Sequence, residues 1–78
     1  MPNMLEGYRT QSLYEASFLL VRGFRLAGRE RSGQKVTIVF EPDANIDGAV
    51  MEFYNGGHAE AKTLFDSFRS LKDLVFQR

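Results

Sequence analysis

The chain offers few side chains that could carry out chemistry. Its single histidine, His58, follows Gly56-Gly57, and the chain has no cysteine. A catalytic histidine needs a nucleophile or substrate within reach, and a metal site built on one histidine needs several carboxylates. The nearby acids Glu52 and Glu60 do not stand at a recognised ligand spacing. We therefore interpret His58 as a loop or capping residue and expect no catalytic residue, no bound metal and no cofactor.

The glycines and acids around His58 also lack a catalytic pattern. A Walker A loop needs Gly-x4-Gly-Lys-Ser/Thr, and a dinucleotide fingerprint needs three spaced glycines after a strand. Neither occurs in the sequence. Asp43 and Asp47 lie one helical turn apart, but Asp43 is better placed as a helix cap, and two surface acids do not define a hydrolase. The sequence therefore favours a protein that is not an enzyme.

The charges are balanced in number but uneven in position. Ten basic and ten acidic residues give a net charge of zero. Residues 22–35 carry five basic residues against one acidic residue, whereas residues 41–60 carry five acidic residues and no Lys or Arg. These two segments can attract each other within the fold or across a dimer. A nucleic-acid interface is the alternative, because a basic hairpin can contact phosphates. Its candidate residues are Arg25, Arg29, Arg31 and Lys35.

Residues 24–40 alternate in polarity like a β-hairpin. A two-residue loop, Ser32-Gly33, would force Ser32 to a positive φ. A three-residue loop, Arg31-Ser32-Gly33, puts Gly33 at the left-handed position of a bulge and is preferred. This loop pairs Phe24 with Phe40 and Leu26 with Ile38 on an apolar face. The opposite face then carries Arg25, Arg29 and Lys35.

The second strand of this hairpin has an edge that another chain could pair with. Residues 36–40 are strongly β-prone and contain no Gly, Pro or charge. In a two-stranded sheet their far edge would be open. Either residues 4–10 cover it, or the same strand of a second subunit does so in an isologous dimer. The candidate dimer edge is Val36, Thr37, Ile38, Val39 and Phe40.

Apolar residues at helical spacing predict three helices, over 11–22, 44–54 and from 59 or 61 to 75. Ser12 with Glu15 matches a capping box, and Asp43 is the expected N-cap of the second helix. The expected fold is α+β: an antiparallel β-hairpin packed on three amphipathic helices, in the order α-β-β-α-α. Residues 1–9 form a flexible or short extended N-terminus, and residues 10–76 form one domain. The aromatic residues expected in the core are Phe18, Phe24, Phe40, Phe53, Phe65 and Phe68.

A spaced set of residues carries a family resemblance over about Tyr8 to Phe76. The set comprises Tyr8-Arg9-Thr10, Leu13-Tyr14, Ala16, Phe18-Leu19, Gly23-Phe24, Glu30-Arg31, residues 35–41 (KVTIVFE) and Phe53-Tyr54-Asn55-Gly56. With it the chain resembles a small family of bacterial, archaeal and phage proteins catalogued as a domain of unknown function. The resemblance implies a compact stand-alone domain, and it provides no catalytic residues.

These observations lead to a functional expectation. We expect a small non-enzymatic protein-interaction module that binds itself or a protein partner. The alternative is an accessory nucleic-acid-binding protein that uses the basic outer face of the hairpin. The longest purely apolar run, residues 18–21, is far too short to span a bilayer, and no segment resembles a targeting signal. We therefore expect no membrane partner and a cytoplasmic location.

Overall fold

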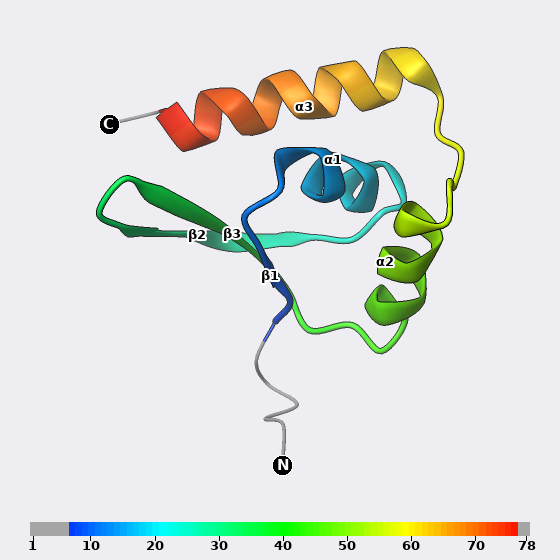
Figure 1. Ribbon diagram of the computed structural model, residues 1–78, viewed down its shortest axis with the longest axis horizontal. Helices are drawn as coiled ribbons and strands as arrows, with labels where there is room; N and C mark the ends of the chain where they lie inside the picture. Colours follow the sequence, from blue (N-terminus) through cyan, green and yellow to red (C-terminus); the bar gives the residue numbers. More distant parts are fainter. Residues whose placement is uncertain (1–6, 77–78) are drawn as a thin grey trace.

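The computed structural model describes residues 7–76. Within them the chain forms three strands and three helices (Figure 1). In chain order these are β1 (Arg9–Thr10), α1 (Leu13–Val21), β2 (Leu26–Ser32), β3 (Lys35–Phe40), α2 (Ile46–Tyr54) and α3 (Ala61–Phe76). The predicted α+β fold is confirmed, with a short N-terminal strand before the first helix. Of the flexible or short extended N-terminus predicted for residues 1–9, residues 1–6 lie outside the described residues.

The sheet is antiparallel and has the order β1-β3-β2, so β3 is the central strand. On one side β3 pairs with its hairpin partner β2, and on the other Arg9 pairs with Val39 and Thr10 with Ile38. The Phe40 N–H also donates to the Tyr8 carbonyl over 2.8 Å. Residues 8–10 therefore cover the β3 edge from Ile38 to Phe40, which was the first of the two predicted alternatives. This part of the candidate dimer edge is paired within the chain.

The hairpin turn differs from both predicted loops. Its two turn residues are Gly33 and Gln34, because Ser32 pairs with Lys35. Gly33 has a φ of +62°, and no described non-glycine residue has a positive φ. A positive φ at the first turn residue alone is the pattern of a type II′ turn, which favours glycine at that position. Both predicted loops are wrong because each made Gly33 the last loop residue.

A β-bulge at Ala27 also changes which side of the sheet each β2 residue faces. Leu26 pairs with Phe40, but the next pair is Gly28 with Val39, so Ala27 is the extra residue. Beyond the bulge, Arg29 pairs with Ile38 and Arg31 with Val36. The predicted pairs of Phe24 with Phe40 and Leu26 with Ile38 are therefore wrong. Since paired residues share one face of a sheet, Arg29 and Arg31 lie on the face that carries the core.

The helix ends follow the sequence closely for α1 and less closely for α2. The Ser12 hydroxyl accepts from the Glu15 N–H over 3.2 Å, and Gly23, with φ +94°, follows the last turn of α1. For α2 the N-cap is Asn45 rather than Asp43. The Asp43 carboxylate instead accepts from the Asn45 N–H over 2.8 Å in the turn before the helix. The helix therefore starts two residues later than predicted.

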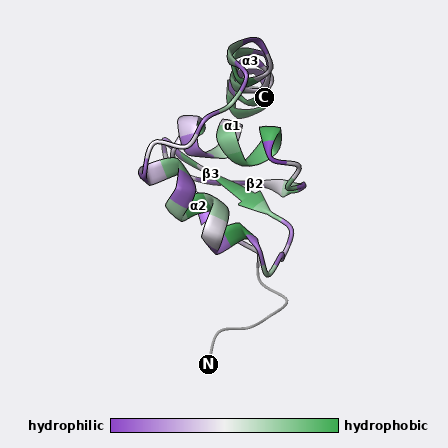
Figure 2. Cartoon of the chain, turned by 90° about the vertical axis from the view of Figure 1, so that its right-hand side faces the viewer, coloured by the Kyte–Doolittle hydropathy of each residue, from purple (hydrophilic) through white to green (hydrophobic). Residues whose placement is uncertain are grey.

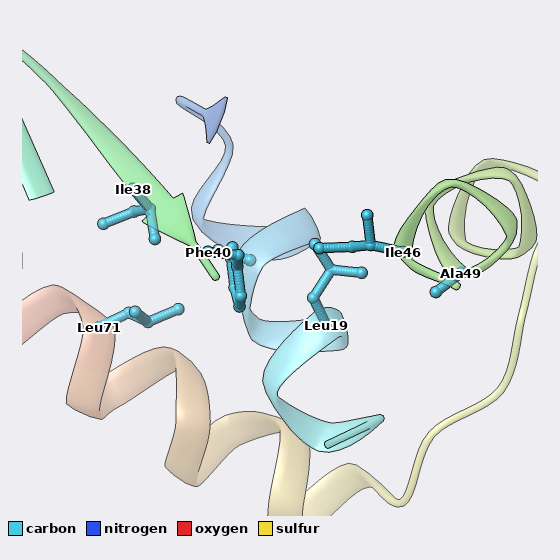
Figure 3. Close-up of a cluster of buried hydrophobic side chains, with 7 residues drawn as sticks. Leu19, Ile38, Phe40, Ile46, Ala49 and Leu71 are labelled. Carbon is cyan, nitrogen blue, oxygen red and sulfur yellow. The ribbon is translucent and has the colours of Figure 1, made fainter. Parts of the chain in front are cut away.

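The core lies where α1 meets the sheet and the other two helices. In two perpendicular views, α1 lies below α3 and next to the sheet, and α2 lies lower on the molecule (Figures 1 and 2). Leu19 of α1, Phe40 of β3 and Leu71 of α3 are almost fully buried and lie together in the close-up (Figure 3). Ile46 and Ala49 bring α2 into the same cluster. All three helices thus share one core with the central strand.

Of the six aromatic residues predicted in the core, one is clearly outside it. Phe40 and Phe18 are buried, and Phe24, Phe53 and Phe68 are partly buried. Phe65 of α3 is 65% exposed. Its prediction as a core residue is wrong because α3 packs on α1 along one narrow line, with only Leu71 buried among its residues. An aromatic residue beside that line remains in solvent.

Candidate protein interface

The four basic hairpin residues proposed as a nucleic-acid interface are not on one surface. Arg31 is exposed, and its Nη2 donates to the Val75 carbonyl in the last turn of α3 over 3.0 Å. Arg29 is half-buried, and its buried Nη1 has no hydrogen-bond partner among residues 7–76. Arg25 and Lys35 are exposed. The predicted outer basic face is therefore wrong, because the turn at Gly33-Gln34 pairs Arg29 with Ile38 on the face that carries the core.

The most distinctive surface lies on α3. Phe65, Arg69, Lys72 and Phe76 follow one another at spacings of four, three and four residues, which places them along one side of the helix. All four are exposed, and the two phenylalanines remain 65% and 71% exposed. We call these four residues the α3 stripe. It combines large apolar side chains at both ends with two positive charges between them.

A ring stack continues the stripe onto α1. Tyr14 of α1 and Phe68 of α3 have ring centroids 5.0 Å apart and planes inclined by 14°. A shallow hollow of about 390 Å³ is lined by Phe65, Phe68, Arg69, Lys72 and Asp73. Because Tyr14 is itself 70% exposed, the aromatic surface extends across the α1–α3 contact. The stripe is therefore part of a broader apolar surface.

The two cations of the stripe form no ion pair within the described part of the chain. Asp66, one turn from Arg69, pairs with Lys62 at 3.2 Å, and neither Arg69 nor Lys72 forms an ion pair or hydrogen bond with another of residues 7–76. Their positive charges are thus available to a partner.

A second surface, on α2, has the opposite charge. Asp47, Met51 and Tyr54 lie at spacings of four and three residues along one side of α2. We call these three residues the α2 face. Met51 is 62% exposed, and Asp47 forms no ion pair with the described residues. Next to them lies a hollow of about 480 Å³, lined by Gly7, Tyr8, Pro42, Asp43, Ala44, Ile46 and Asp47.

A buried carboxylate joins three separate parts of the chain. Glu15 of α1 is 2% exposed and accepts hydrogen bonds from the hydroxyls of Tyr8 and Tyr54, the latter over 2.5 Å. Burial, followed by the hydrogen bond to Glu15, raises the pKa of Tyr8 far above its ordinary value. For Tyr54 the hydrogen bond to Glu15 is the main cause of a raised pKa. Both hydroxyls therefore keep their protons and serve as donors, which holds β1 and α2 against α1.

The sequence pattern did not predict this cluster, because the spacing of Ser12 and Glu15 matches a capping box. One hydrogen bond of that box is present, because the Ser12 hydroxyl accepts from the Glu15 N–H. The other is replaced, because the Ser12 N–H donates to the Thr10 hydroxyl over 3.1 Å. The Glu15 side chain is therefore used elsewhere. A signal was available, since a glutamate on the buried side of an amphipathic helix requires hydrogen-bond donors.

His58 lies in the connection before α3, as its reading as a loop residue predicted. Its side chain is exposed, and its carbonyl accepts from Arg22 Nη2 over 2.9 Å. The Arg22 guanidinium also lies 4.5 Å from the Phe18 ring centroid and pairs with Glu52. No group of three His, Asp or Glu residues suited to a metal ion occurs within residues 7–76. The contacts around His58 thus tie the end of α1 to α2 and to the connection.

The fold and its surfaces define a small α+β domain with a three-stranded antiparallel sheet and an exposed aromatic and basic helix. The chain belongs to the DUF5659 family, a domain of unknown function, whose family model matches residues 6–77. No curated protein and no solved structure matches the chain significantly. Over the described residues, no helix is both long enough and apolar enough to cross a membrane.

Proposed function

We propose that this protein is a non-enzymatic interaction domain that binds a protein through the α3 stripe. The observation behind the proposal is that Phe65 and Phe76 remain mostly exposed on the same side of one helix. Arg69 and Lys72 lie between them and form no ion pair with any of residues 7–76. Exposed apolar patches of this kind are typical of protein-binding surfaces. Aromatic residues and arginine are also the types enriched at the energetic centres of interfaces.

The charges of the stripe indicate the kind of partner that fits. Two cations flanked by aromatic rings, with no ion pair in the part of the chain that the structure describes, suit a segment that presents carboxylates beside apolar side chains. Such a segment would bury the rings and neutralise Arg69 and Lys72 at the same time. Complementary charges at the rim chiefly speed association and set its orientation, whereas burial of the rings supplies most of the affinity.

The experiment is site-specific photocrosslinking in cells that naturally produce the protein. A benzophenone amino acid replaces Phe65, and a matched control carries it at Ser70, an exposed position on another side of the same helix. We expect a protein crosslink from position 65 and none from position 70. Charge reversal by Arg69→Glu and Lys72→Glu should lower the yield from position 65.

Two results would contradict the proposal. Crosslinking of position 65 to nucleic acid would make the stripe a base-stacking surface, in the manner of single-strand binders. Equal yields from positions 65 and 70, or no crosslink from either, would show that the stripe has no specific protein partner.

The variants with the benzophenone amino acid at positions 65 and 70 should both retain the far-ultraviolet circular dichroism spectrum of the parent, because the substitutions are at exposed positions.

A further inference from the structure

We propose that the partner of the α3 stripe is the α2 face of a second copy of this chain; this inference rests on the proposed function. The two surfaces match in composition. The stripe presents two cations with aromatic rings, and the α2 face presents Asp47 and Met51 beside a hollow that Asp43 also lines. The same chain therefore carries both halves of a complementary contact.

The charges are free to make this contact. Neither Arg69 nor Lys72 is paired within residues 7–76, and Asp47 is likewise without an ion pair there. The Asp43 carboxylate accepts from a backbone N–H but has no cationic partner among the described residues. An acidic hollow of about 480 Å³ has room for the end of a long basic side chain. Opposite charges brought together across an interface select the partner and its orientation.

The apolar parts of the two surfaces also match. Met51 is flexible and polarizable, and it makes favourable contacts with aromatic rings. Phe65 and Phe76 provide such rings on the α3 stripe, and Met51 lies in the middle of the α2 face. Contact between them would remove large apolar side chains from water on both partners.

Geometry prevents the two surfaces from meeting within one molecule. Both α2 and α3 pack on α1. In both overall views α3 lies above α1 while α2 lies lower, toward the opposite end of the molecule (Figures 1 and 2). The contact must therefore form between copies, head to tail. A head-to-tail contact leaves one free surface at each end, so it builds rings or open chains rather than a closed two-fold dimer.

The test uses purified full-length protein and light scattering coupled to size-exclusion chromatography. The parent chain should form species larger than dimers as its concentration rises, and added salt should disperse them. One variant blocks the stripe with Arg69→Glu and Lys72→Glu. Another blocks the α2 face with Asp47→Lys and Met51→Lys, and Met51→Lys alone replaces it if the double variant does not fold. Each should associate at least about tenfold more weakly than the parent.

Mixing the two blocked variants gives the decisive result. One retains only an intact α2 face and the other only an intact stripe, so the mixture should form a one-to-one dimer and nothing larger. A control variant with Arg25→Glu and Lys35→Glu changes the net charge as much as the stripe variant does, yet it should assemble like the parent.

Three results would overturn the inference. One is a parent chain that remains a monomer at every concentration, and another is a mixture that forms no dimer. The third is loss of assembly in the hairpin control. If position 65 nevertheless crosslinks to a different protein in cells, the proposed function stands while the second copy is excluded as partner.

Discussion

The ring of Tyr14 on α1 stacks on the ring of Phe68 on α3, with centroids 5.0 Å apart and planes 14° from parallel. This contact does two things. It joins the two helices at the edge of the core, where Leu71 is the only buried residue of α3. It also leaves Tyr14 mostly exposed, as a continuation of the α3 stripe. The position of the stripe on the molecule therefore depends partly on one ring pair.

A double-mutant cycle at Tyr14 and Phe68 should reveal this coupling. We expect Tyr14→Ala and Phe68→Ala each to lower the free energy of unfolding. The decrease in the double variant should be smaller than the sum of the two single decreases. The coupling energy should be about 0.5–1.5 kcal/mol, as for other aromatic pairs. Urea denaturation of the four proteins measures it. Strictly additive losses would show that the stack contributes nothing beyond burial.

Loss of the Tyr8 hydroxyl should destabilise the fold. Tyr8→Phe removes one of two donors to the buried Glu15 carboxylate, and a hydrogen bond to a charged group contributes about 1.5–3 kcal/mol. The control is Tyr14→Phe, because the Tyr14 hydroxyl forms no hydrogen bond with the described residues, and it should have little effect. The urea concentrations at the midpoints of unfolding compare the Tyr8→Phe and Tyr14→Phe variants. Equal stability of Tyr8→Phe and the parent would mean that water replaces this donor without cost.

The same cluster should make stability fall at high pH. The pKa values of Tyr8 and Tyr54 are raised in the folded state, so the unfolded chain releases these protons first. The stabilising effect is complete below the ordinary tyrosine pKa of about 10 and is lost progressively as pH rises above it. Unfolding free energies between about pH 8 and about pH 11 should fall more steeply for the parent than for the Tyr8→Phe, Tyr54→Phe double variant. Parallel curves would contradict this assignment.

Arg31 should stabilise the last turn of α3. Its guanidinium donates to the Val75 carbonyl, one of the terminal carbonyls that lack a helical partner, and a cation there also interacts favourably with the helix dipole. We expect Arg31→Ala to cost about 0.3–1 kcal/mol and to speed amide hydrogen exchange in the last turn of α3. Lys35→Ala, at an exposed position of the same hairpin, is the control. Unchanged exchange in α3 would show that the contact does not hold the helix end.

The helices could be predicted well because their signals are local. Ser12 and Gly23 determine the ends of α1 through one hydroxyl and one left-handed residue, and both signals hold in the structure. The hairpin was recognised but its register was not. The type II′ turn at Gly33 and the bulge at Ala27 together decide which side each β2 residue faces, and a bulge leaves little trace in the pattern of polarity. The basic outer face was predicted from a register with a different turn, whereas the observed turn pairs Arg29 with Ile38.

The candidate interface was beyond sequence reasoning for a different reason. Phe65 stands beside Leu64 and Phe68 in an amphipathic pattern that reads as one wide apolar side. How much of that side is buried depends on how many elements pack against α3, and α1 is the main one. Glu15 shows the converse case, because it is buried and accepts a hydrogen bond from Tyr54, which lies 39 residues away in the sequence. Both assignments required the tertiary packing.

The most direct test of contact between the α3 stripe and the α2 face of a second copy is a dilution series followed by two-dimensional amide NMR. We expect concentration-dependent shifts at Phe65, Arg69, Lys72 and Phe76, with matching shifts at Asp47 and Met51 from the opposite side of the contact. Amides at the hairpin turn, residues 33–34, should not move. Spectra that stay unchanged from the millimolar to the low micromolar range, or shifts confined to β3 and the hairpin, would contradict this contact between copies.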